Sequence, residues 1–252
     1  MRLDQSTWCE VEQYLLRSTG IIIPAGSTEQ HGPIGLIGTD TICADAVAVA
    51  AAELLDALVA PPLGYSPAAF NLAFPGTVSI SESLFEELAL CIIDSLSGQG
   101  FRFFYFLNAH GRNTAPLRRA GERRKELSVR VRSWWDFEEV NRLRQSCFGD
   151  WEGMHATPSE ISITSHIGRQ VTSAAADTPP RRLTRGYIEA RKGDRHGPAE
   201  EHRAEFPDGR VGSHSALARP AYGAELLRAA ASAVADDYAE FLRASDPEPA
   251  TG

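Results

Sequence analysis

Cysteine is scarce in this sequence, and its spacing suits neither a zinc ribbon nor a disulfide framework. Among 252 residues there are four cysteines, no two of them in C-x-x-C spacing: Cys9, Cys43, Cys91 and Cys147. A densely cross-linked secreted domain is therefore not indicated. The pattern is typical of a protein of the reducing cytoplasm, where we expect this one to reside.

Long apolar runs are lacking as well. No stretch approaches the roughly 18 apolar residues that are needed to cross a bilayer. The opening residues, Met1 to Gln5, are not followed by the apolar segment of a signal peptide. From the sequence we expect neither membrane insertion nor secretion.

Positive charge is not concentrated anywhere in the chain. There are 25 Lys and Arg residues against 33 Asp and Glu residues, which gives a formal net charge of −8. The basic residues are scattered apart from short runs such as Arg118-Arg119 and Arg123-Arg124-Lys125. Because nucleic-acid affinity depends on a concentrated positive surface, we expect a small-molecule substrate and no nucleic-acid partner.

What the sequence does contain is an alternation of strand and helix patterns. Apolar or alternating segments predict strands at 21–25, 101–107 and 129–135. Alanine- and leucine-rich or amphipathic segments predict helices at 44–59, after Ser83, at 114–127 and at about 221–243. Ser83 and Glu86 are candidates for a capping box. Residues 171–215 have little periodicity and predict an irregular surface excursion.

This alternation predicts an α/β fold with a mostly parallel central sheet. With 43% apolar residues the chain can bury a substantial core. We predict a single domain over residues 1–245 and a disordered tail over 246–252. In such sheets, functional loops follow the carboxyl ends of the strands.

The loop after the first predicted strand carries Glu29, His31 and Asp40 within GSTEQHGPIGLIGTD. Carboxylate and imidazole groups are ligands that divalent Zn, Mn or Fe accepts. The i, i+2 spacing lets Glu29 and His31 face one side of an extended segment, and the glycines allow Asp40 to return to the same point. The alternative makes Glu29 and His31 surface loop residues and Asp40 a helix N-cap.

Two further blocks carry candidate ligands. His110, in NAHGRN, follows a strand that should be central, so its imidazole should project into the same crevice, unless it is a hydrogen-bonded loop residue. His155 and Glu160 lie in HATPSE, where Pro158 suits the first turn of a helix that would present Glu160. The alternative makes Glu160 a partner of the helix dipole.

Together these blocks resemble the creatininase (creatinine amidohydrolase) family. The family's G-S-x-E-Q-H-G-P segment ending in T-D, its F-P-G-T, N-G-H-G-x-N and H-A-x-x-x-E blocks, and its late P-D-G-R-x-G-S stretch recur here in order. The matching residues are 26–33 with 39–40, 74–77, 108–113, 155–160 and 207–213, with Ala109 replacing a glycine.

The resemblance implies a three-layer α/β/α sandwich, two divalent metal ions (Zn, Mn or Fe) per subunit and a homo-oligomer, usually a hexamer. By motif position, Glu29 and His31 would each hold one metal, Asp40 would bridge both, and His110 would complete the first. Glu160 is the candidate for the remaining carboxylate. In creatininase a glutamate two residues after the N-G-H histidine does that work, whereas this chain has Arg112, which cannot coordinate a metal.

The implied reaction is hydrolysis of a C–N bond in a small cyclic amide or formamide. Two cations would share a water molecule, lower its pKa and polarise the carbonyl. His155 would pass a proton to the departing nitrogen, or, alternatively, brace a metal ligand. Ile34 stands where many relatives have a histidine, which makes the expected pocket less polar and creatinine an unexpected substrate.

Other functions stay open at this point. The same dinuclear site would suit a hydrolase or lyase acting on a cyclic sugar ketone, or a peptidase for a modified-peptide cofactor precursor. A non-catalytic metal-binding scaffold is a third class, and it would be indifferent to His155→Ala. Three tryptophans could line a pocket for a flat ring, although we expect a core role for at least two of them: Trp134, Trp135 and Trp151.

Overall fold

A computed structural model of the chain describes residues 1–244. The segment 246–252, for which a disordered tail was predicted, lies outside the described residues. Within the described part, no helix combines the length and the apolar composition that a membrane span requires.

Three parallel strands form the central sheet, in the order β1-β2-β3. They are β1 (Gly20–Ala25), β2 (Phe103–Asn108) and β3 (Ser128–Ser133), so all three predicted strands are present with ends shifted by about two residues at most. The segment after the next helix extends the sheet beyond β1, where the Ile22 N–H donates to the Leu58 carbonyl at 2.9 Å. The parallel sheet predicted from the alternation is confirmed.

Strands β1 and β2 are buried on both faces, β3 is partly exposed, and side chains of the buried strands alternate between two hydrophobic cores. Ile22, Tyr105 and Leu107 pack into one core, and Ile21, Ile23, Phe104 and Phe106 pack into the other. Successive residues of a strand point to opposite faces, so continuous apolar runs are what a sheet covered on both sides requires.

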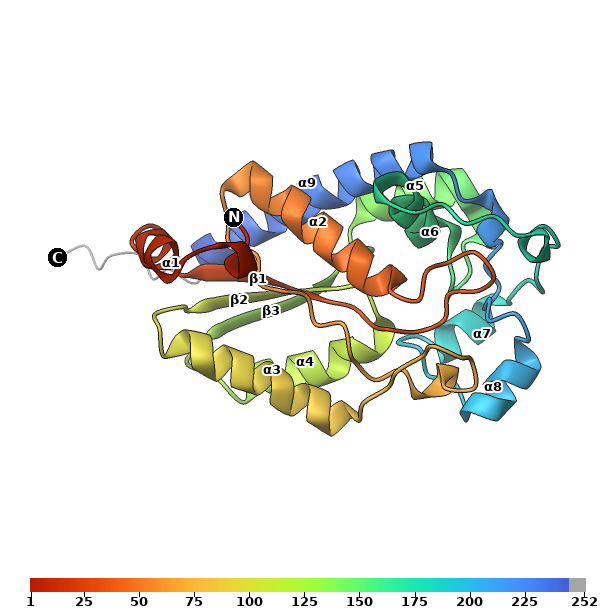
Figure 1. Ribbon diagram of the computed structural model, residues 1–252, viewed down its shortest axis with the longest axis horizontal. Coiled ribbons are helices and arrows are strands. Elements are labelled where there is room, and N and C mark those ends of the chain that lie inside the picture. Colours follow the sequence, from red (N-terminus) through yellow and green to blue (C-terminus); the bar gives the residue numbers. More distant parts are fainter. Residues whose placement is uncertain (245–252) are drawn as a thin grey trace.

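Helices cover both faces of the sheet, which confirms the three-layer α/β/α sandwich (Figure 1). One layer contains α2 (Thr39–Leu55), α5 (Glu138–Phe148), α6 (Pro158–Ile167) and α9 (Pro220–Ala244). The other contains α3 (Glu82–Ser97) and α4 (Thr114–Glu122). Helix α1 (Trp8–Leu15) lies at one end of the molecule, and α7 (Arg185–Ala190) and α8 (Ala199–Glu205) lie at the other.

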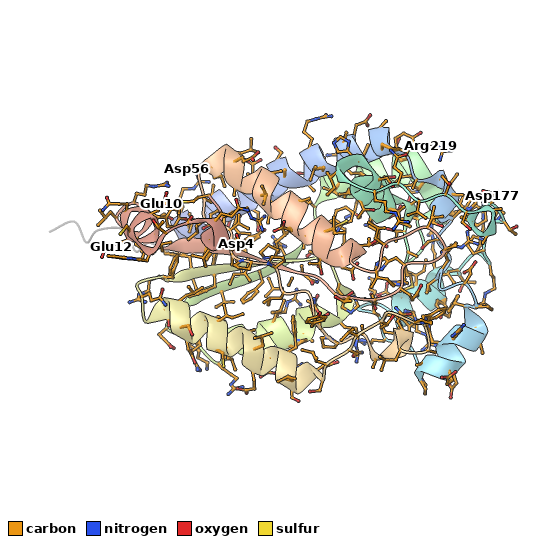
Figure 2. All side chains as sticks on the ribbon, in the orientation of Figure 1. Asp4, Glu10, Glu12, Asp56, Asp177 and Arg219 are labelled. Atoms are coloured by element: carbon orange, nitrogen blue, oxygen red, sulfur yellow. The ribbon has the colours of Figure 1, made fainter. Side chains whose placement is uncertain are left out.

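Short 3₁₀ turns complete the described chain: Leu3–Gln5, Ala69–Asn71, Gly111–Asn113, Gly149–Trp151, Ala174–Ala176 and Ser215–Leu217. The side chains of both layers fill the space against the sheet (Figure 2).

The prediction of a helix over 44–59 was wrong at both ends. Helix α2 begins at Thr39, with Gly38 as its N-cap, so Asp40 lies in the first turn and is not the cap. A carboxylate in the first turn favours the helix because it faces the positive end of the helix dipole. The helix ends at Leu55, since Asp56 adopts a left-handed conformation and the chain then pairs with β1.

The capping box expected of Ser83 and Glu86 is also absent. Ser81 caps α3 instead, and its hydroxyl accepts the Leu84 N–H at 3.2 Å. Glu86 faces α4, where it pairs with Arg119 at 2.7 Å. Both serines satisfy the local rule for a cap, and packing of α3 against α4 selects the earlier one.

Two other boundaries differ from the predictions. The helix expected over 114–127 ends at Glu122 and continues as turns. The stretch 171–215 is not wholly irregular, because it contains α7 and α8, each of fewer than eight residues. Thr184 caps α7 by accepting the Tyr187 N–H at 3.1 Å. Helices this short have little periodicity for a sequence pattern to reveal.

We expect Gly26→Ala to destabilise the fold next to the start of α2. A Cβ at Gly26 would lie 2.3 Å from the Thr41 backbone nitrogen, which cannot move aside as a flexible side chain can. The free energy of unfolding, measured by urea denaturation, should fall by about 1–3 kcal/mol. The control is Gly98→Ala, where a Cβ meets only ordinary contacts at 3.5 Å and the change should stay below about 1 kcal/mol. Equal effects at both positions would contradict this packing argument.

Candidate metal centre

The polar residues singled out in the first two blocks lie together at the carboxyl end of the sheet. Glu29 and His31 follow β1, His110 follows the central strand β2, and Asp40 lies in the first turn of α2. All four side chains are at most 3% exposed. Carboxyl ends of neighbouring parallel strands share one edge, which is why these distant blocks meet.

Two groups of potential ligands share Asp40. In the first triad (Glu29, Asp40 and His110), His110 Nδ1 lies 3.0 Å from Glu29 Oε1 and 3.2 Å from Asp40 Oδ2. In the second triad (His31, Asp40 and Glu160), His31 Nε2 lies 2.9 Å from Asp40 Oδ1 and 3.7 Å from Glu160 Oε1. Asp40 thus presents one carboxylate oxygen to each triad.

Backbone carbonyls orient both imidazoles of the triads. His110 Nε2 donates to the Pro67 carbonyl at 2.8 Å, which leaves Nδ1 facing Glu29 and Asp40. His31 Nδ1 donates to the Glu29 carbonyl at 3.1 Å, which leaves Nε2 facing Asp40 and Glu160. Such outer hydrogen bonds fix the tautomer that a metal-binding histidine needs.

Glu160 has two roles in this arrangement. It occupies the third position of α6, where its Oε1 accepts the Thr157 N–H at 2.6 Å while the Thr157 hydroxyl accepts the Glu160 N–H. The helix-start interpretation of Glu160 therefore describes its local structure. The same carboxylate lies in the second triad, so the two interpretations are compatible.

His155 lies beside both triads on the loop that leads into α6. Its Nε2 donates to the Gln30 carbonyl at 2.7 Å, and its Nδ1 lies 3.7 Å from Glu29 Oε1. The next residue, Ala156, has φ +56°, a left-handed conformation that a residue with a Cβ rarely adopts. Strained backbone of this kind concentrates at functional sites, where the surrounding structure holds it in place.

The carboxylates of the site favour the protonated, positively charged form of the nearby imidazoles. Burial opposes the charged form of His31, but Asp40, Glu160 and Glu29 outweigh it and raise the pKa of His31 to about 10. The pKa of His110 is likewise raised well above its usual value, since Glu29 and Asp40 outweigh burial. Burial would raise the pKa of Asp40, yet His31 and His110 hold it well below the usual range.

At Glu160 and His155, burial outweighs the opposing charges and hydrogen bonds. It raises the pKa of Glu160 to about 8. It also lowers the pKa of His155 to about 4, with the charge of His31 adding to the effect. His155 is therefore a neutral imidazole near pH 7.

Divalent cations fit the residues that are present. Glu29 Oε1 is buried and accepts no hydrogen bond within the described residues, because the nearby His110 Nδ1 lies outside hydrogen-bond geometry. No lysine or arginine of the described chain forms an ion pair with the three carboxylates Glu29, Asp40 and Glu160. Buried carboxylates need a charged partner, and mixed oxygen and imidazole donors suit Zn or Mn.

Sequence reasoning missed two residues that contact this cluster. Asn71 donates from Nδ2 to Glu29 Oε2 at 2.9 Å, and the Asp194 carboxylate lies 3.9 Å from His110 Nδ1. Burial raises the pKa of Asp194 to about 6. Neither residue stands in a block with a recognisable pattern, and Asp194 belongs to the stretch that was predicted to be irregular.

The late P-D-G-R block also reaches the site. The Gly209 carbonyl accepts a hydrogen bond from Gln30 Nε2 at 3.0 Å, and a Cβ at Gly209 would collide with the Gln30 side chain at 1.9 Å. Only glycine fits this approach, which also requires φ +79°. The block therefore holds the loop that carries Glu29 and His31.

A cavity of about 160 Å³ opens onto the cluster and is lined by Glu29, Asp40, His110, His155 and Glu160. Trp134 and Trp135 also line it while packing edge to face within one of the cores, which confirms a core role for two tryptophans. Trp151 instead packs under the Arg182 guanidinium. Ile34 does not line this cavity as described, and Arg112 pairs with Glu82 at 2.7 Å.

Fold and site together define the class of this protein. It is a three-layer α/β/α protein with a buried cluster of carboxylates and imidazoles at the carboxyl end of its sheet, arranged as a candidate dinuclear metal centre. The family model described as creatinine amidohydrolase matches residues 4–237. The chain belongs to the creatininase family of hydrolases.

Curated relatives carry three different activities in their names. A mycofactocin precursor peptide peptidase of Mycolicibacterium smegmatis is 41% identical over 38% of this chain and 41% of its own length. A 3-dehydro-scyllo-inosose hydrolase of Thermotoga maritima is 35% identical over 42% of this chain and 34% of its own length. A creatinine amidohydrolase of Pseudomonas putida is 28% identical over 62% of this chain and 68% of its own length. The matched segments of the first two thus span less than half of those relatives.

Solved structures establish the fold over nearly the whole chain. A mutant creatininase complexed with creatine has a TM-score of 0.76 at 22% identity, covering 98% of this chain and 99% of its own. Creatininase structures of a Zn–Zn type and with Mn reach TM-scores of 0.74 and 0.73, each at 23% identity over 96% of this chain and 98% of theirs. The family and fold that the sequence blocks indicated are confirmed.

We expect Asp40→Asn to remove metal binding at both triads. The substitution takes away the one negative charge that both triads share, so affinity should fall by more than the roughly 10–100-fold that loss of an outer hydrogen-bond partner costs. Metal content after dialysis, measured by mass spectrometry, should drop from two ions per chain to below one. Asp45→Asn, on the same helix but paired with Arg2 at 2.9 Å, should keep both ions.

Metal affinity should rise with pH. The carboxylates raise the pKa of His31 to about 10 and that of His110 well above normal, so both imidazoles hold protons at pH 7 before a metal binds. The metal-free form then carries more protons than the metal-bound form, and raising the pH favours binding, by about tenfold per pH unit for each proton displaced. Calorimetry in buffers of different ionisation enthalpy should detect proton release, and heats independent of the buffer would contradict this expectation.

Proposed function

We propose that this protein is a metal-dependent amidohydrolase that cleaves the C–N bond of a small cyclic amide or formamide. The observation that carries the proposal is the sharing of Asp40 between two buried triads, with the His155 imidazole beside them. Membership of the creatininase family supports the same reaction class.

In this proposal Glu29, Asp40 and His110 hold one divalent ion, and His31, Asp40 and Glu160 hold the other. When bound, two such ions would polarise a carbonyl oxygen and lower the pKa of a water molecule. Zn and Mn are the candidates, because the donors are carboxylates and imidazoles and similar creatininase structures contain these metals.

His155 is the group that we propose moves the proton. Its Nε2 is committed to the Gln30 carbonyl at 2.7 Å, so Nδ1 is the nitrogen free to take and return a proton. Since burial lowers the pKa of His155 to about 4, the neutral ring starts as a base and then delivers the proton readily to the departing nitrogen.

The surrounding residues position this machinery and exclude water. Asn71 holds the second oxygen of Glu29 at 2.9 Å, which leaves Oε1 directed toward His110. His155 is only 5% exposed, and Trp134 closes the cavity from the core side. A site with little water strengthens the electrostatic interactions inside it.

A second candidate is a peptidase acting on a modified-peptide precursor. It is favoured by the 41% identity to the mycofactocin peptidase and by a larger hollow of about 790 Å³ beside the metal cavity, which offers room for residues flanking a scissile bond. A third candidate reaction is hydrolysis of a cyclic sugar ketone, suggested by the name of the Thermotoga relative. The substrate screen described below includes cyclic ketones for this reason.

We further propose a cytoplasmic homo-oligomer, with the hexamer implied by family resemblance as the expected state. The scattered cysteines support the location. Light scattering coupled to size-exclusion chromatography measures the assembly directly.

The test of the function compares His155→Ala with His166→Ala, a matched substitution at an exposed histidine near the end of α6. The zinc- or manganese-loaded protein is screened against formamides, lactams, short peptides and cyclic ketones. His155→Ala should lower kcat by about 10²–10⁴-fold while keeping two ions per chain, and His166→Ala should retain full activity. Activity of His155→Ala equal to that of the wild type would refute the proposed role.

A further inference from the structure

A second hollow adjoins the metal cavity. This hollow, here called the vestibule, has a volume of about 790 Å³ and shares Gly111, Trp135, Lys192 and Gly193 with the lining of the metal cavity. Its charged lining consists of Arg112, Arg118, Lys192, Arg195, Glu82 and Asp136. The vestibule is thus the neighbouring space for the part of a substrate that extends beyond the metal cavity.

The vestibule is positive although the protein is negative. Four basic and two acidic side chains line it, an excess of two positive charges, whereas the whole chain carries −8.

Two of the vestibule arginines have no partner within residues 1–244. Arg112 pairs with Glu82 at 2.7 Å, and Lys192 pairs with Glu189 at 2.7 Å in an exposed contact of the kind that contributes little. Arg118 and Arg195 make no side-chain hydrogen bond or ion pair in this part of the chain, and both are exposed. Their guanidinium groups are available to a ligand.

Two arginines near Arg118 do have carboxylate partners: Arg119 in α4 and Arg123 at the C-terminal end of that helix. Arg119 pairs with Glu86 at 2.7 Å, and Arg123 pairs with Glu87 at 2.6 Å, so α3 supplies a carboxylate for each. Arg118 lies on α4 and lines the vestibule, where the one carboxylate from α3, that of Glu82, pairs with Arg112 and Arg119 instead. Arg118 and Arg195 therefore present unpaired guanidinium groups to the vestibule within the described residues.

The start of α4 borders the vestibule but does not offer a row of free amides. Thr114 and Ala115, the first two residues of this nine-residue helix, line the vestibule. The Thr114 N–H already donates to the Gly111 carbonyl, and Pro116 has no N–H. An anion in the vestibule would therefore depend on the guanidinium groups, which suit carboxylate and phosphate oxygens.

We infer that the vestibule binds an anionic group, a carboxylate or a phosphate, on the part of the substrate remote from the scissile C–N bond. The inference rests on the proposed function and narrows its substrate class to anionic amides. Arg118 and Arg195 are the residues that would contact the anion, with Lys192 between them and the triads. A nucleic acid is disfavoured as the occupant because the net charge of the protein is negative.

The kinetic test uses three formamides of similar size: N-formylethanolamine, its phosphate monoester and N-formylglycine. For the metal-loaded wild type, kcat/KM should be at least about tenfold higher for an anionic substrate than for the neutral one. In the double variant Arg118→Gln/Arg195→Gln, that ratio should fall about tenfold, chiefly through KM. The phosphate and carboxylate arms show which anion the vestibule accepts.

The matched control is Arg142→Gln, which removes one positive charge from an exposed position on α5 where Arg142 contacts Glu138 at 3.8 Å. It should leave the anion preference unchanged. An equal loss in Arg142→Gln would mean that general charge attracts the substrate, and this result would overturn the assignment of the vestibule.

A binding measurement separates failure of the inference from failure of the proposed function. Calorimetry on the zinc-loaded protein with phenyl phosphate and benzoate should give a dissociation constant at least about tenfold weaker in the double variant than in the wild type. Such a loss, found without hydrolysis of any amide, supports the anion site and rejects the amidohydrolase. Hydrolysis with no anion preference, and equal binding by both proteins, overturns the inference alone.

Discussion

The structure depends on the accumulation of negative charge around Asp40. Three carboxylates, Glu29, Asp40 and Glu160, are buried together, and the described chain brings them no lysine or arginine. Within the described residues, imidazoles are the positively charged groups that oppose their repulsion, and neutral donors such as Asn71 and Thr157 add hydrogen bonds. In the proposed enzyme, cations would take the place of the imidazole protons. Buried charge without a partner costs several kcal/mol, so the loops that deliver these side chains must be held firmly.

The fold supplies that restraint through layers of backbone contact. Gly26 packs against the first turn of α2 and fixes Asp40 relative to β1, and Gly209 packs against Gln30 from the other end of the chain. The His155 carbonyl pairs with Val211 on the same late segment. Residues that touch no substrate thus determine the positions of those that would.

The layers and much of the candidate site were predictable from the sequence, because they follow from short-range rules. Apolar runs placed the strands, and the shared edge of a parallel sheet placed Glu29, His31 and His110 together. Asn71 and Asp194 were not predictable, since their segments have no periodicity and only tertiary packing brings them to the cluster. The cap of α3 was mispredicted because the local pattern favours Ser83, which has Glu86 three residues later, whereas Ser81 caps the helix and Glu86 pairs with Arg119 of α4.

Glu160 couples the stability of a helix to the chemistry of the site. Its Oε1 accepts the Thr157 N–H at 2.6 Å to start α6, and the same oxygen lies nearest to His31. Because a carboxylate has lone pairs enough for both, a cation at the proposed second triad would share Glu160 with the cap of α6, a contact worth about 1 kcal/mol. In the proposed enzyme, loss of that cation and fraying of the first turn of α6 would therefore be linked, and stability of the helix would report on occupancy of the site.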